Sequence, residues 1–284
     1  MLLLCFFTSS KKWSSTKIYL KYLCIFAPQN SLTMITATPI REKELVIGSY
    51  FVDNRQQLTV SALLGLMQEI AWEHSTSYNA GWDFLQSINL FWALSKMRLI
   101  INRMPLWNEV VRLCTWGKQP ENVIFHRDFE MYDTQGNKLL SATSAWTTLS
   151  TVDGRVQRIP AEVSQRIVVP ENRHAIREAA PKVKKIPVVN PPCWHSVLHS
   201  DIDMNQHVNN ARYVQWALNH FPHEFQNQHD IKELIINYLS QAKMGDLYAI
   251  EQLEEVPKRF ISLIYAQNDN REICKVESLW KKCS

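Results

Sequence analysis

The chain lacks any C-x-x-C pair, although it contains six cysteines, at positions 5, 24, 114, 193, 274 and 283. Closely spaced cysteine pairs are the usual sign of a zinc site, and an even, dense set in a short secreted chain is the usual sign of a disulfide framework. The scattered positions indicate neither, so we expect free thiols in a reducing compartment, with no bound metal and no cofactor. Cys193 and Cys274 are expected to be buried as small apolar residues.

The first 33 residues contain no Asp or Glu, whereas they contain Lys11, Lys12, Lys17 and Lys21. Without these four lysines, the 31 basic residues of the chain fall to 27, which equals the 27 acidic ones. The formal net charge of +4 is therefore confined to residues 1–33. Because the rest of the chain is neutral overall, its bulk charge predicts no binding of nucleic acid.

Residues 1–33 also lack an apolar run long enough to span a bilayer, since their two bursts are Leu2 to Phe7 and Ile18 to Phe26. A secretory signal needs basic residues ahead of its apolar run, and the first burst starts at residue 2. We expect no membrane span, and we interpret residues 1–33 as a mis-assigned start ahead of Met34 or as a targeting segment. The first interpretation predicts a cytoplasmic protein, and a transit peptide would predict a plastid protein.

The order of elements at about 43–160 recurs at about 193–283. A helix is expected at Leu58 to His74 and again at Asn209 to Phe221, from apolar residues at helical spacing. Each helix is followed by a strand with the letters Leu-Ile-Ile-Asn, at 99–102 and at 234–237. Each copy then continues with an apolar strand, a hairpin tipped with turn residues and a closing strand.

Two copies of a helix followed by antiparallel strands indicate an α+β fold with tandem domains, because at 46% hydrophobic residues the chain can bury a large core. We expect an N-terminal domain at 34–160, a linker at 161–192 and a C-terminal domain at 193–284. The linker is predicted from its prolines and from the charges between Arg173 and Lys185.

The most informative segment is the loop Asp201 to Asn210, directly ahead of the second helix. It places Asp203, Asn205 and His207 at every second position, which in an extended segment puts three side chains on one side. The helix N-terminus behind them offers free N–H groups and a partial positive charge. A carboxylate, an amide, an imidazole and an electropositive helix end are the parts of an acyl-transfer site.

The first half contains a faded copy of this loop. At an offset of 150, Asp53 faces Asp203, but Arg55 faces Asn205 and Gln57 faces His207. We therefore expect one reactive loop per chain, with the first half free to shape an apolar pocket. The residues expected to line that pocket are Leu63, Met67, Ile70, Trp82 and Trp92.

Residues 200–213, Ser-Asp-Ile-Asp-Met-Asn-Gln-His-Val-Asn-Asn-Ala-Arg-Tyr, closely resemble the active-site segment of plant and bacterial acyl-acyl carrier protein (acyl-ACP) thioesterases. The resemblance covers about residues 40–283 and implies two tandem hot-dog domains, each an antiparallel sheet wrapped around a central helix. It implies hydrolysis of fatty acyl-ACP to free fatty acid and holo-carrier, which terminates fatty acid synthesis. It also implies that Asp203, Asn205 and His207 are catalytic and that the first hot-dog holds the acyl chain.

The chain departs from that family at one place. Plant members have Glu-Cys shortly after a Tyr on the strand that follows the second helix, and aligning this Tyr with Tyr238 puts Gln241 and Ala242 there. Because Ala242 has no thiol, attack by water or by Asp203 itself is favoured.

In that mechanism Asp203 is the base or nucleophile, Asn205 orients the water, and His207 shuttles the proton or holds Asp203 in place. Gln241 is expected to support the site with one more hydrogen bond. The oxyanion is expected to contact the backbone N–H groups of Val208, Asn209 and Asn210.

Several alternatives stay open. A hydratase on the same fold would resemble Asp-x-Asn-x-x-His, whereas here His207 follows Asp203 by four positions. A coenzyme A thioesterase would need a phosphate-binding basic cluster, which we do not recognise. A non-catalytic acyl-binding protein would fit a silenced site. An acidic carrier protein is expected to contact Lys184-Lys185 or Lys258-Arg259, and exposed β edges allow a homodimer.

Overall fold

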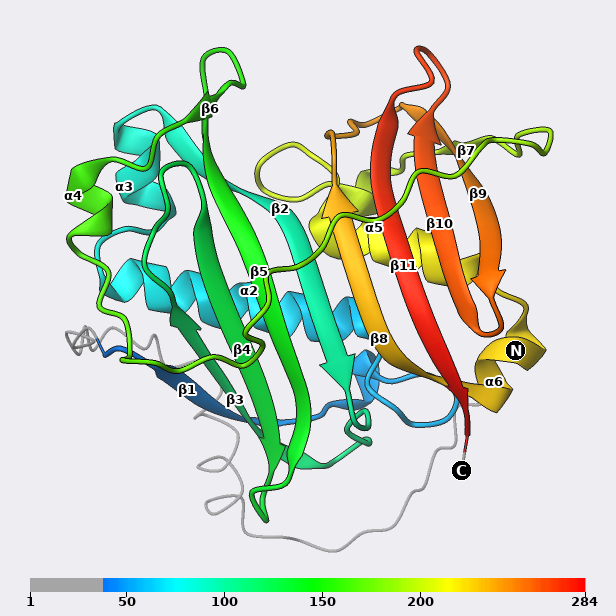
Figure 1. Ribbon diagram of the computed structural model, residues 1–284, viewed down its shortest axis with the longest axis horizontal. Coiled ribbons are helices and arrows are strands. Elements are labelled where there is room, and N and C mark those ends of the chain that lie inside the picture. The colour runs from blue at the N-terminus through cyan, green and yellow to red at the C-terminus, as the bar shows by residue number, and fades with distance from the viewer. Residues whose placement is uncertain (1–37, 284) are drawn as a thin grey trace, which may run out of the picture. The chain divides into compact units, whose positions relative to one another are not determined.

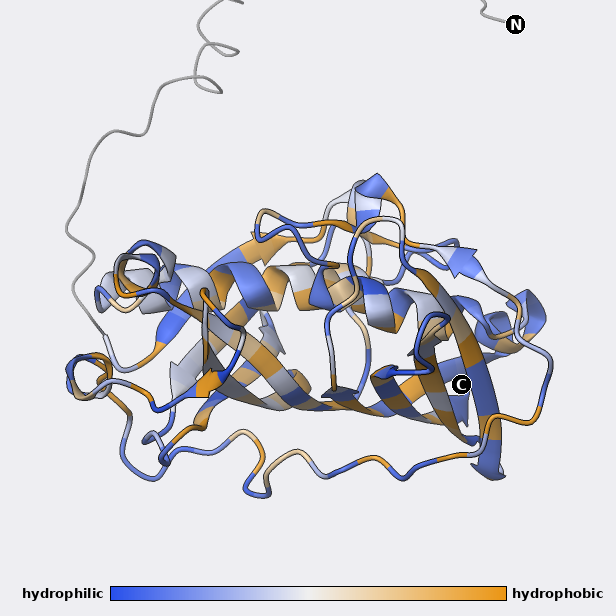
Figure 2. Cartoon of the chain, turned by 90° about the horizontal axis from the view of Figure 1, so that it is seen from above, coloured by the Kyte–Doolittle hydropathy of each residue, from blue (hydrophilic) through white to orange (hydrophobic). Residues whose placement is uncertain are grey.

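Two long helices lie against one face of an antiparallel sheet in the computed structural model (Figures 1 and 2), which describes residues 38–283. The expectation for residues 1–33 lies outside these residues. The sheet has eleven strands in the order β1-β3-β4-β5-β2-β8-β11-β10-β9-β7, with β6 paired to β5. Within residues 38–283, no helix combines the length and the apolar character needed to cross a membrane.

The first half folds around α2. Thr59 caps this helix, because its hydroxyl accepts the Ala62 N–H at 3.2 Å. The predicted helix at 58–74 is thus present, two residues later at its start. The elements of this half are β1 (Arg41–Val46), η2 (Ser49–Phe51), α2 (Val60–Ser77), α3 (Trp82–Ser87), β2 (Leu90–Ile101), β3 (Val110–Gly117), β4 (Phe125–Asp133), β5 (Lys138–Ser150), β6 (Val156–Gln157) and α4 (Ala161–Ser164).

The second half repeats this order around α5. Asn209 caps the helix by accepting the Ala211 N–H at 3.0 Å, and Pro222 follows its end. The elements are β7 (His195–Ser196), η3 (His199–Asp201), α5 (Asn210–Asn219), α6 (His223–Gln228), β8 (His229–Tyr238), β9 (Leu247–Val256), β10 (Arg259–Ala266) and β11 (Glu272–Lys282).

The two halves join where β2 pairs with β8. Leu99 lies directly opposite Leu234 in this pairing, and both side chains are fully buried. The repeated Leu-Ile-Ile-Asn letters therefore lie on the two strands that meet at the centre of the molecule. Arg98 adds an ion pair across the join, 2.7 Å from Glu233. One continuous sheet with a helix cradled by each half confirms the predicted α+β, tandem hot-dog fold.

The segment 161–192 runs along the sheet face opposite the helices (Figures 1 and 2). Val183 and Ile186 are buried there against the sheet, and the Val183 N–H donates to Asn237 Oδ1 at 2.9 Å. The segment links the halves, but it is a packed strap and not a free tether. Because the described residues cluster as one unit, the domain boundaries near 160 and 193 stay a prediction.

Candidate active site

The loop at 201–210 is a closed turn and not an extended segment. The Asp203 N–H donates to the His207 carbonyl oxygen at 2.9 Å, and the Gln206 N–H donates to the Asp203 carbonyl at 3.0 Å. Gln206 has a φ of 63°, in the left-handed region. The expectation that three alternate side chains share one side is therefore wrong. Asp203 and Asn205 line a cavity, and His207 is not among its lining residues.

This cavity has a volume of about 250 Å³ and lies mainly in the first half. Residues of the second half, Asp203, Met204, Asn205 and Asn210, form part of its wall. The remaining wall is strongly aromatic, with Trp72, Tyr78, Trp82, Phe91, Trp92, Phe125 and Trp146. The arrangement brings a carboxylate and an amide from one half to a largely aromatic cavity in the other.

A hydrogen bond between the halves fixes Asn205. Trp82 Nε1 donates to Asn205 Oδ1 at 3.1 Å, and an indole N–H can only donate. The amide oxygen of Asn205 thus faces Trp82, which leaves its NH₂ group as a donor. Asp203 Oδ1 accepts the Asn205 N–H at 2.8 Å, and Oδ2 has no hydrogen bond within residues 38–283. The second carboxylate oxygen is available for chemistry.

Two of the three backbone N–H groups expected to contact the oxyanion already donate to other acceptors. The Val208 N–H donates to the Ala242 carbonyl at 3.1 Å, and the Asn209 N–H donates to the Asp201 carbonyl at 2.9 Å. Neither can donate to a substrate while the loop keeps this structure. The Asn210 N–H has no acceptor among the described residues and belongs to a residue of the cavity wall. Of the three expected oxyanion donors, it is the one whose N–H has no other acceptor among the described residues.

The residues at the Glu-Cys positions lie away from the cavity. Gln241 is exposed and does not line the cavity, so the structure gives no contact for its expected supporting role. Ala242 is fully buried, and its N–H donates to Tyr213 Oη at 3.0 Å.

The two cysteines expected to be buried differ. Cys274 is buried as expected, and burial raises the pKa of its thiol. Cys193 is exposed, so the expectation that it is buried is wrong.

The His207 side chain is partly buried beside the loop. Its Nδ1 is enclosed and has no hydrogen-bond partner within residues 38–283. Burial lowers the pKa of His207 below its ordinary value, the positive charge of Lys243 lowers it further, and the negative charge of Asp203 opposes both. The ring is therefore neutral at pH 7 and able to accept a proton.

Lys243→Gln should move the acid limb of the pH profile of kcat/KM to higher pH. In the unmodified protein that limb should lie below pH 6.5, because the pKa of His207 is lowered. Removing the Lys243 charge removes one of the causes, so the pKa of His207 rises. The measurement is kcat/KM for one acyl thioester between pH 4.5 and 8. An unmoved limb would show that His207 does not set it.

The residues expected to line the pocket divide into two groups. Trp82 and Trp92 line the cavity, and Met67 borders a smaller one of about 20 Å³. Leu63 and Ile70 pack in the main core and line neither cavity. The reason is that the cavity follows a neighbouring stripe of α2 and the residue after its end. These are Gln68, Glu69, Ala71, Trp72 and Ser75, and then Tyr78.

Sequence reasoning missed a buried polar cluster on the cavity wall. Arg127 Nη1 donates to His74 Nδ1 at 3.0 Å and to Thr115 Oγ1 at 3.2 Å, and Tyr78 Oη lies 2.5 Å from His74 Nε2. The signal was present in the alternation of inward positions on β4, where Arg127 stands between Phe125 and Phe129.

This cluster makes folding sensitive to acid. Burial, together with the charge of Arg127, lowers the pKa of His74 to about 4. Between pH 6.5 and 4 the unfolded chain binds this proton and the folded chain does not, so stability falls as pH falls. The contribution of His74 should be up to about 3 kcal/mol. Urea unfolding at pH 7 and 4.5 should show a shallower pH dependence for His74→Gln, and equal slopes would contradict the assignment.

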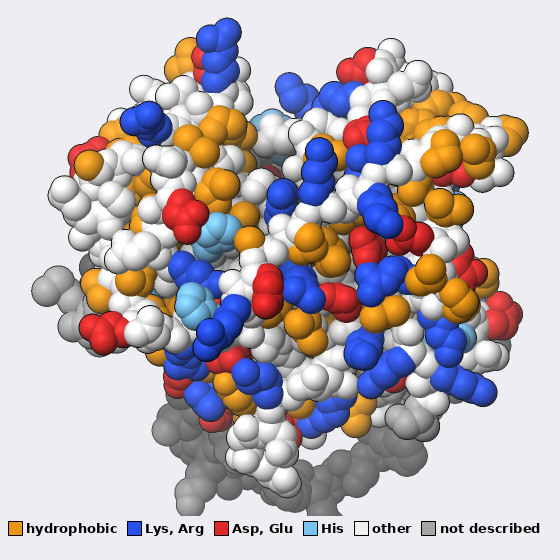
Figure 3. Space-filling view, viewed as in Figure 1, with side chains coloured by type: hydrophobic (Ala, Val, Ile, Leu, Met, Phe, Trp, Pro, Cys, Tyr) orange, Lys and Arg blue, Asp and Glu red, His pale blue; other side chains and the backbone are white. Residues whose placement is uncertain are grey.

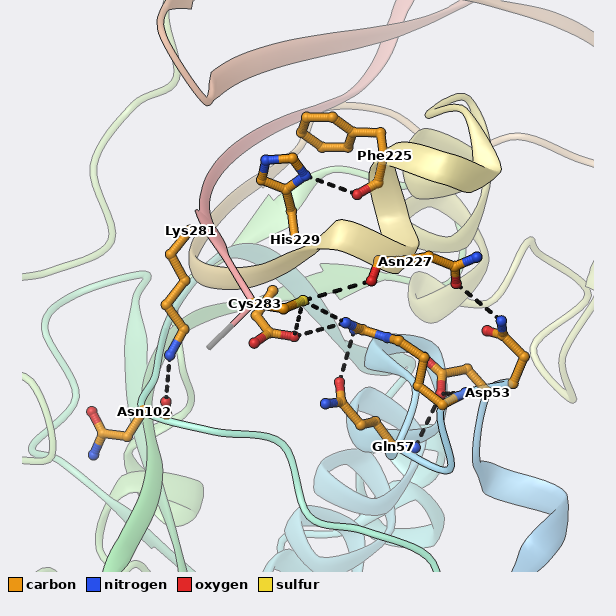
Figure 4. A network of polar contacts seen from close by, with 11 residues as sticks. Asp53, Gln57, Asn102, Phe225, Asn227, His229, Lys281 and Cys283 are labelled. Carbon is orange, nitrogen blue, oxygen red and sulfur yellow. Dashed lines mark hydrogen bonds and ion pairs between the residues drawn. The ribbon is translucent and has the colours of Figure 1, made fainter.

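The copy of the loop in the first half forms a similar turn, in which Arg55 and Gln57 replace the amide and the imidazole. Figure 4 shows its polar contacts with the second half. The Asp53 N–H donates to the Gln57 carbonyl at 2.9 Å, and Gln56 has a φ of 60°. Arg55 Nη1 lies 3.0 Å from Asp230 Oδ1, so this loop is held by an ion pair with the second half. Within residues 38–283, no three His, Cys, Asp or Glu side chains form a metal-binding group. One reactive loop per chain stays a prediction.

A continuous sheet packs around two helices, and a loop of one half places the Asp203 carboxylate at the largely aromatic cavity of the other half. This arrangement defines a double hot-dog protein. Residues 41–167 match the acyl-ACP thioesterase N-terminal domain, and residues 194–282 match the acyl-ACP thioesterase C-terminal domain. The chain belongs to the acyl-ACP thioesterase family.

Named relatives and solved structures agree with this membership. The chain is 27% identical to oleoyl-acyl carrier protein thioesterase 2, chloroplastic, of Arabidopsis thaliana, over 83% of this chain and 69% of that one. It is 26% identical to oleoyl-acyl carrier protein thioesterase 1, chloroplastic, of the same plant. That match covers 92% of this chain and 81% of the other. An acyl-ACP thioesterase from Bacteroides thetaiotaomicron has the same fold, with a TM-score of 0.78, 22% identity and coverage of 86% and 98%. The 12:0-ACP thioesterase from Umbellularia californica also has this fold, with a TM-score of 0.76 and 22% identity. The match covers 87% of this chain and 98% of that one.

Proposed function

We propose that this chain hydrolyses the thioester between a fatty acyl chain and acyl carrier protein, releasing free fatty acid and holo-carrier and so terminating fatty acid synthesis. The observation that carries the proposal is the position of the Asp203 carboxylate and the Asn205 amide on the wall of an aromatic cavity. Family membership supports the same reaction. The cavity receives the acyl chain, and the loop meets the thioester.

Asp203 acts as the general base. Its free Oδ2 takes a proton from a water molecule, whose oxygen attacks the thioester carbonyl carbon. The Asn205 NH₂ group and the Asn210 N–H donate to the oxyanion, with help from the dipole of α5. Collapse of the intermediate breaks the C–S bond. His207, neutral at pH 7, accepts through water the proton that Asp203 took up and passes it to the departing thiolate, which regenerates the Asp203 carboxylate.

Direct attack by Asp203 is the competing route. It would form an acyl-carboxyl anhydride on the enzyme, which water then cleaves. A single turnover in H₂¹⁸O distinguishes the two routes, because only the anhydride route can leave ¹⁸O in the Asp203 side chain. Label found in Asp203 would establish the anhydride route, because water activated by Asp203 carries all of its label into the fatty acid.

That the carrier contacts Lys184-Lys185 or Lys258-Arg259 stays a prediction. Lys184 forms an ion pair with Glu255, and Arg259 forms one with Glu277, so their charges are already balanced. Figure 3 shows basic and acidic side chains interspersed on the side of the molecule that faces the viewer in Figure 1. Preference for the carrier is therefore a matter for assay, in which thiol release by the full chain from acyl-ACP is compared with release from acyl-coenzyme A of the same chain length. Faster release from coenzyme A would favour that alternative, and no release from either would favour a non-catalytic acyl-binding protein.

The assembly and the compartment stay predictions. A homodimer is not needed to complete the site, because both halves of one chain contribute to it. The β1 edge carries alternating charges, which disfavour edge pairing. The Arabidopsis relatives are described as chloroplastic. We infer a cytoplasmic protein unless residues 1–33 direct a fused fluorescent protein into a plastid, and that fusion is the test.

A further inference from the structure

Trp82 reaches from the first half to the loop that carries Asp203. Its Nε1 donates to Asn205 Oδ1 at 3.1 Å, and the Asn205 side chain has no other hydrogen bond within residues 38–283. The indole ring also lines the aromatic cavity, whose wall includes Asn205. One side chain therefore contacts both the space proposed for the acyl chain and the amide proposed to donate to the oxyanion.

Helix α3 anchors Trp82 on one side only. Leu85, one turn further along this helix, is fully buried and lines the same cavity, so it ties the helix to the first half. Trp82 itself is 38% exposed, and the only described hydrogen bond of its side chain is the one to Asn205. Since the protein does not enclose the ring, a group that packs against it from the cavity changes how firmly it is held.

Trp92 lines the same cavity without a link to the loop. Its Nε1 donates to the Ala80 carbonyl oxygen at 3.2 Å, and its ring packs against Phe125, so both contacts stay within the first half. The two tryptophans are thus alike as parts of the cavity wall, but only the N–H of Trp82 engages a group of the second half. An effect of Trp82 on the chemical step should therefore be absent for Trp92.

We propose that Trp82 is a positioning residue that couples binding of the acyl chain to the chemical step. Its N–H holds the amide oxygen of Asn205, which leaves the NH₂ group free to donate to the oxyanion. An acyl chain packed against the ring restrains the indole and, through it, the amide. The chain then raises kcat as well as lowering KM, since binding energy remote from the reacting carbon contributes to catalysis in this way. This inference rests on the proposed function, because it assigns the Asn205 NH₂ group to the oxyanion.

Trp82→Phe keeps most of the ring but removes the N–H. It should lower kcat for a long-chain acyl-ACP by about 10-fold and leave KM nearly unchanged, because the lost contact acts only in the transition state. The loss should be smaller than the roughly 100-fold expected for Asn205→Ala, which removes the donor itself. Because Trp82 acts through Asn205, adding Trp82→Phe to Asn205→Ala should lower kcat no further. A four-carbon acyl-ACP leaves most of the cavity empty, so Trp82→Phe should change its kcat far less.

Trp92→Phe is the matched control, because it makes the same change in the same cavity and should leave kcat within about two-fold of the unmodified value. Full kcat of Trp82→Phe overturns the proposal, and so does an equal loss of kcat in both variants. An equal effect of Trp82→Phe with and without the Asn205 amide also overturns it, because the residue would then act by another route.

The indole N–H signals in a ¹H–¹⁵N NMR spectrum test the same coupling without activity. Trp82→Phe and Trp92→Phe each remove one signal and so assign it. Asn205→Ala should shift the Trp82 signal and leave the Trp92 signal in place, and a long-chain free fatty acid should shift the Trp82 signal of the unmodified protein. A Trp82 signal that responds to neither overturns the proposal. If the unmodified protein cleaves no acyl thioester, the proposed function fails, and the spectrum still distinguishes that failure from failure of the coupling.

Discussion

Replacing Asp203 by asparagine should lower kcat for an acyl-ACP substrate by about 10³-fold, because a positioned general base contributes roughly this factor. The change is gentle for the fold. Asparagine still offers an Oδ1 that accepts the Asn205 N–H, which Asp203 now accepts at 2.8 Å. What disappears is the negative charge and the basic Oδ2. The measurement is single-turnover thiol release together with a thermal melt, which should stay nearly unchanged.

The chain contains its own control for this experiment. Asp53 occupies the same turn in the first half, where its Oδ1 accepts the Arg55 N–H at 2.9 Å and the Gln57 N–H at 3.0 Å. Asp53→Asn should leave kcat within a few-fold of the unmodified value, because this loop faces the Arg55–Asp230 ion pair and not the aromatic cavity. Full activity of Asp203→Asn, or an equal loss in both variants, would remove Asp203 from the mechanism.

The repeat explains why so much of the fold was predictable. Helices, strands and hairpin tips follow from local periodicity, and both halves give the same order, so each supports the other. The Leu-Ile-Ile-Asn strands were recognised as copies, but their direct pairing of Leu99 with Leu234 was not. Pairing partners are set by packing between distant segments, which no local pattern contains.

The loop shows where local reasoning failed. Alternate side chains share a side only in extended backbone, and the turn at Gln206 breaks that condition. Glycine or asparagine would have signalled a left-handed residue, whereas glutamine gives no such signal. The engaged N–H groups of Val208 and Asn209 depend on the distant acceptor Ala242 and on the backbone of Asp201. These contacts exist only once the loop is folded.

Two of the expected pocket residues, Leu63 and Ile70, do not line the cavity, for a different reason. Helix α2 has two adjacent stripes that are both rich in apolar side chains, and hydrophobicity does not say which one faces a cavity. Leu63 and Ile70 lie on the stripe that meets the sheet, whereas Ala71 lies on the one beside the cavity. The small side chain of Ala71 contributes to the space itself. A larger side chain at this position should therefore reduce the volume of the cavity.

Ala71→Phe should lower kcat/KM for a long-chain acyl-ACP by about 100-fold while a short-chain substrate is affected far less. The ring would occupy the volume of about four methylenes, and each buried methylene is worth about 0.8 kcal/mol. The loss of about 3 kcal/mol corresponds to this factor. Ala71→Leu should give an intermediate result. The measurement is kcat/KM over a series of chain lengths.

Gly65→Phe is the control for the ring itself, because Gly65 lies on the exposed side of α2 with no atom within 4 Å of a Cβ placed there. It adds the same side chain to the same helix but leaves the cavity open, so its chain-length profile should match that of the unmodified protein. A thermal melt separates overpacking from blockage, since overpacking destabilises and lowers activity on every substrate alike. An unchanged profile for a folded Ala71→Phe would mean that the acyl chain lies elsewhere, whereas a profile shifted to short chains would assign it to the aromatic cavity of the first half.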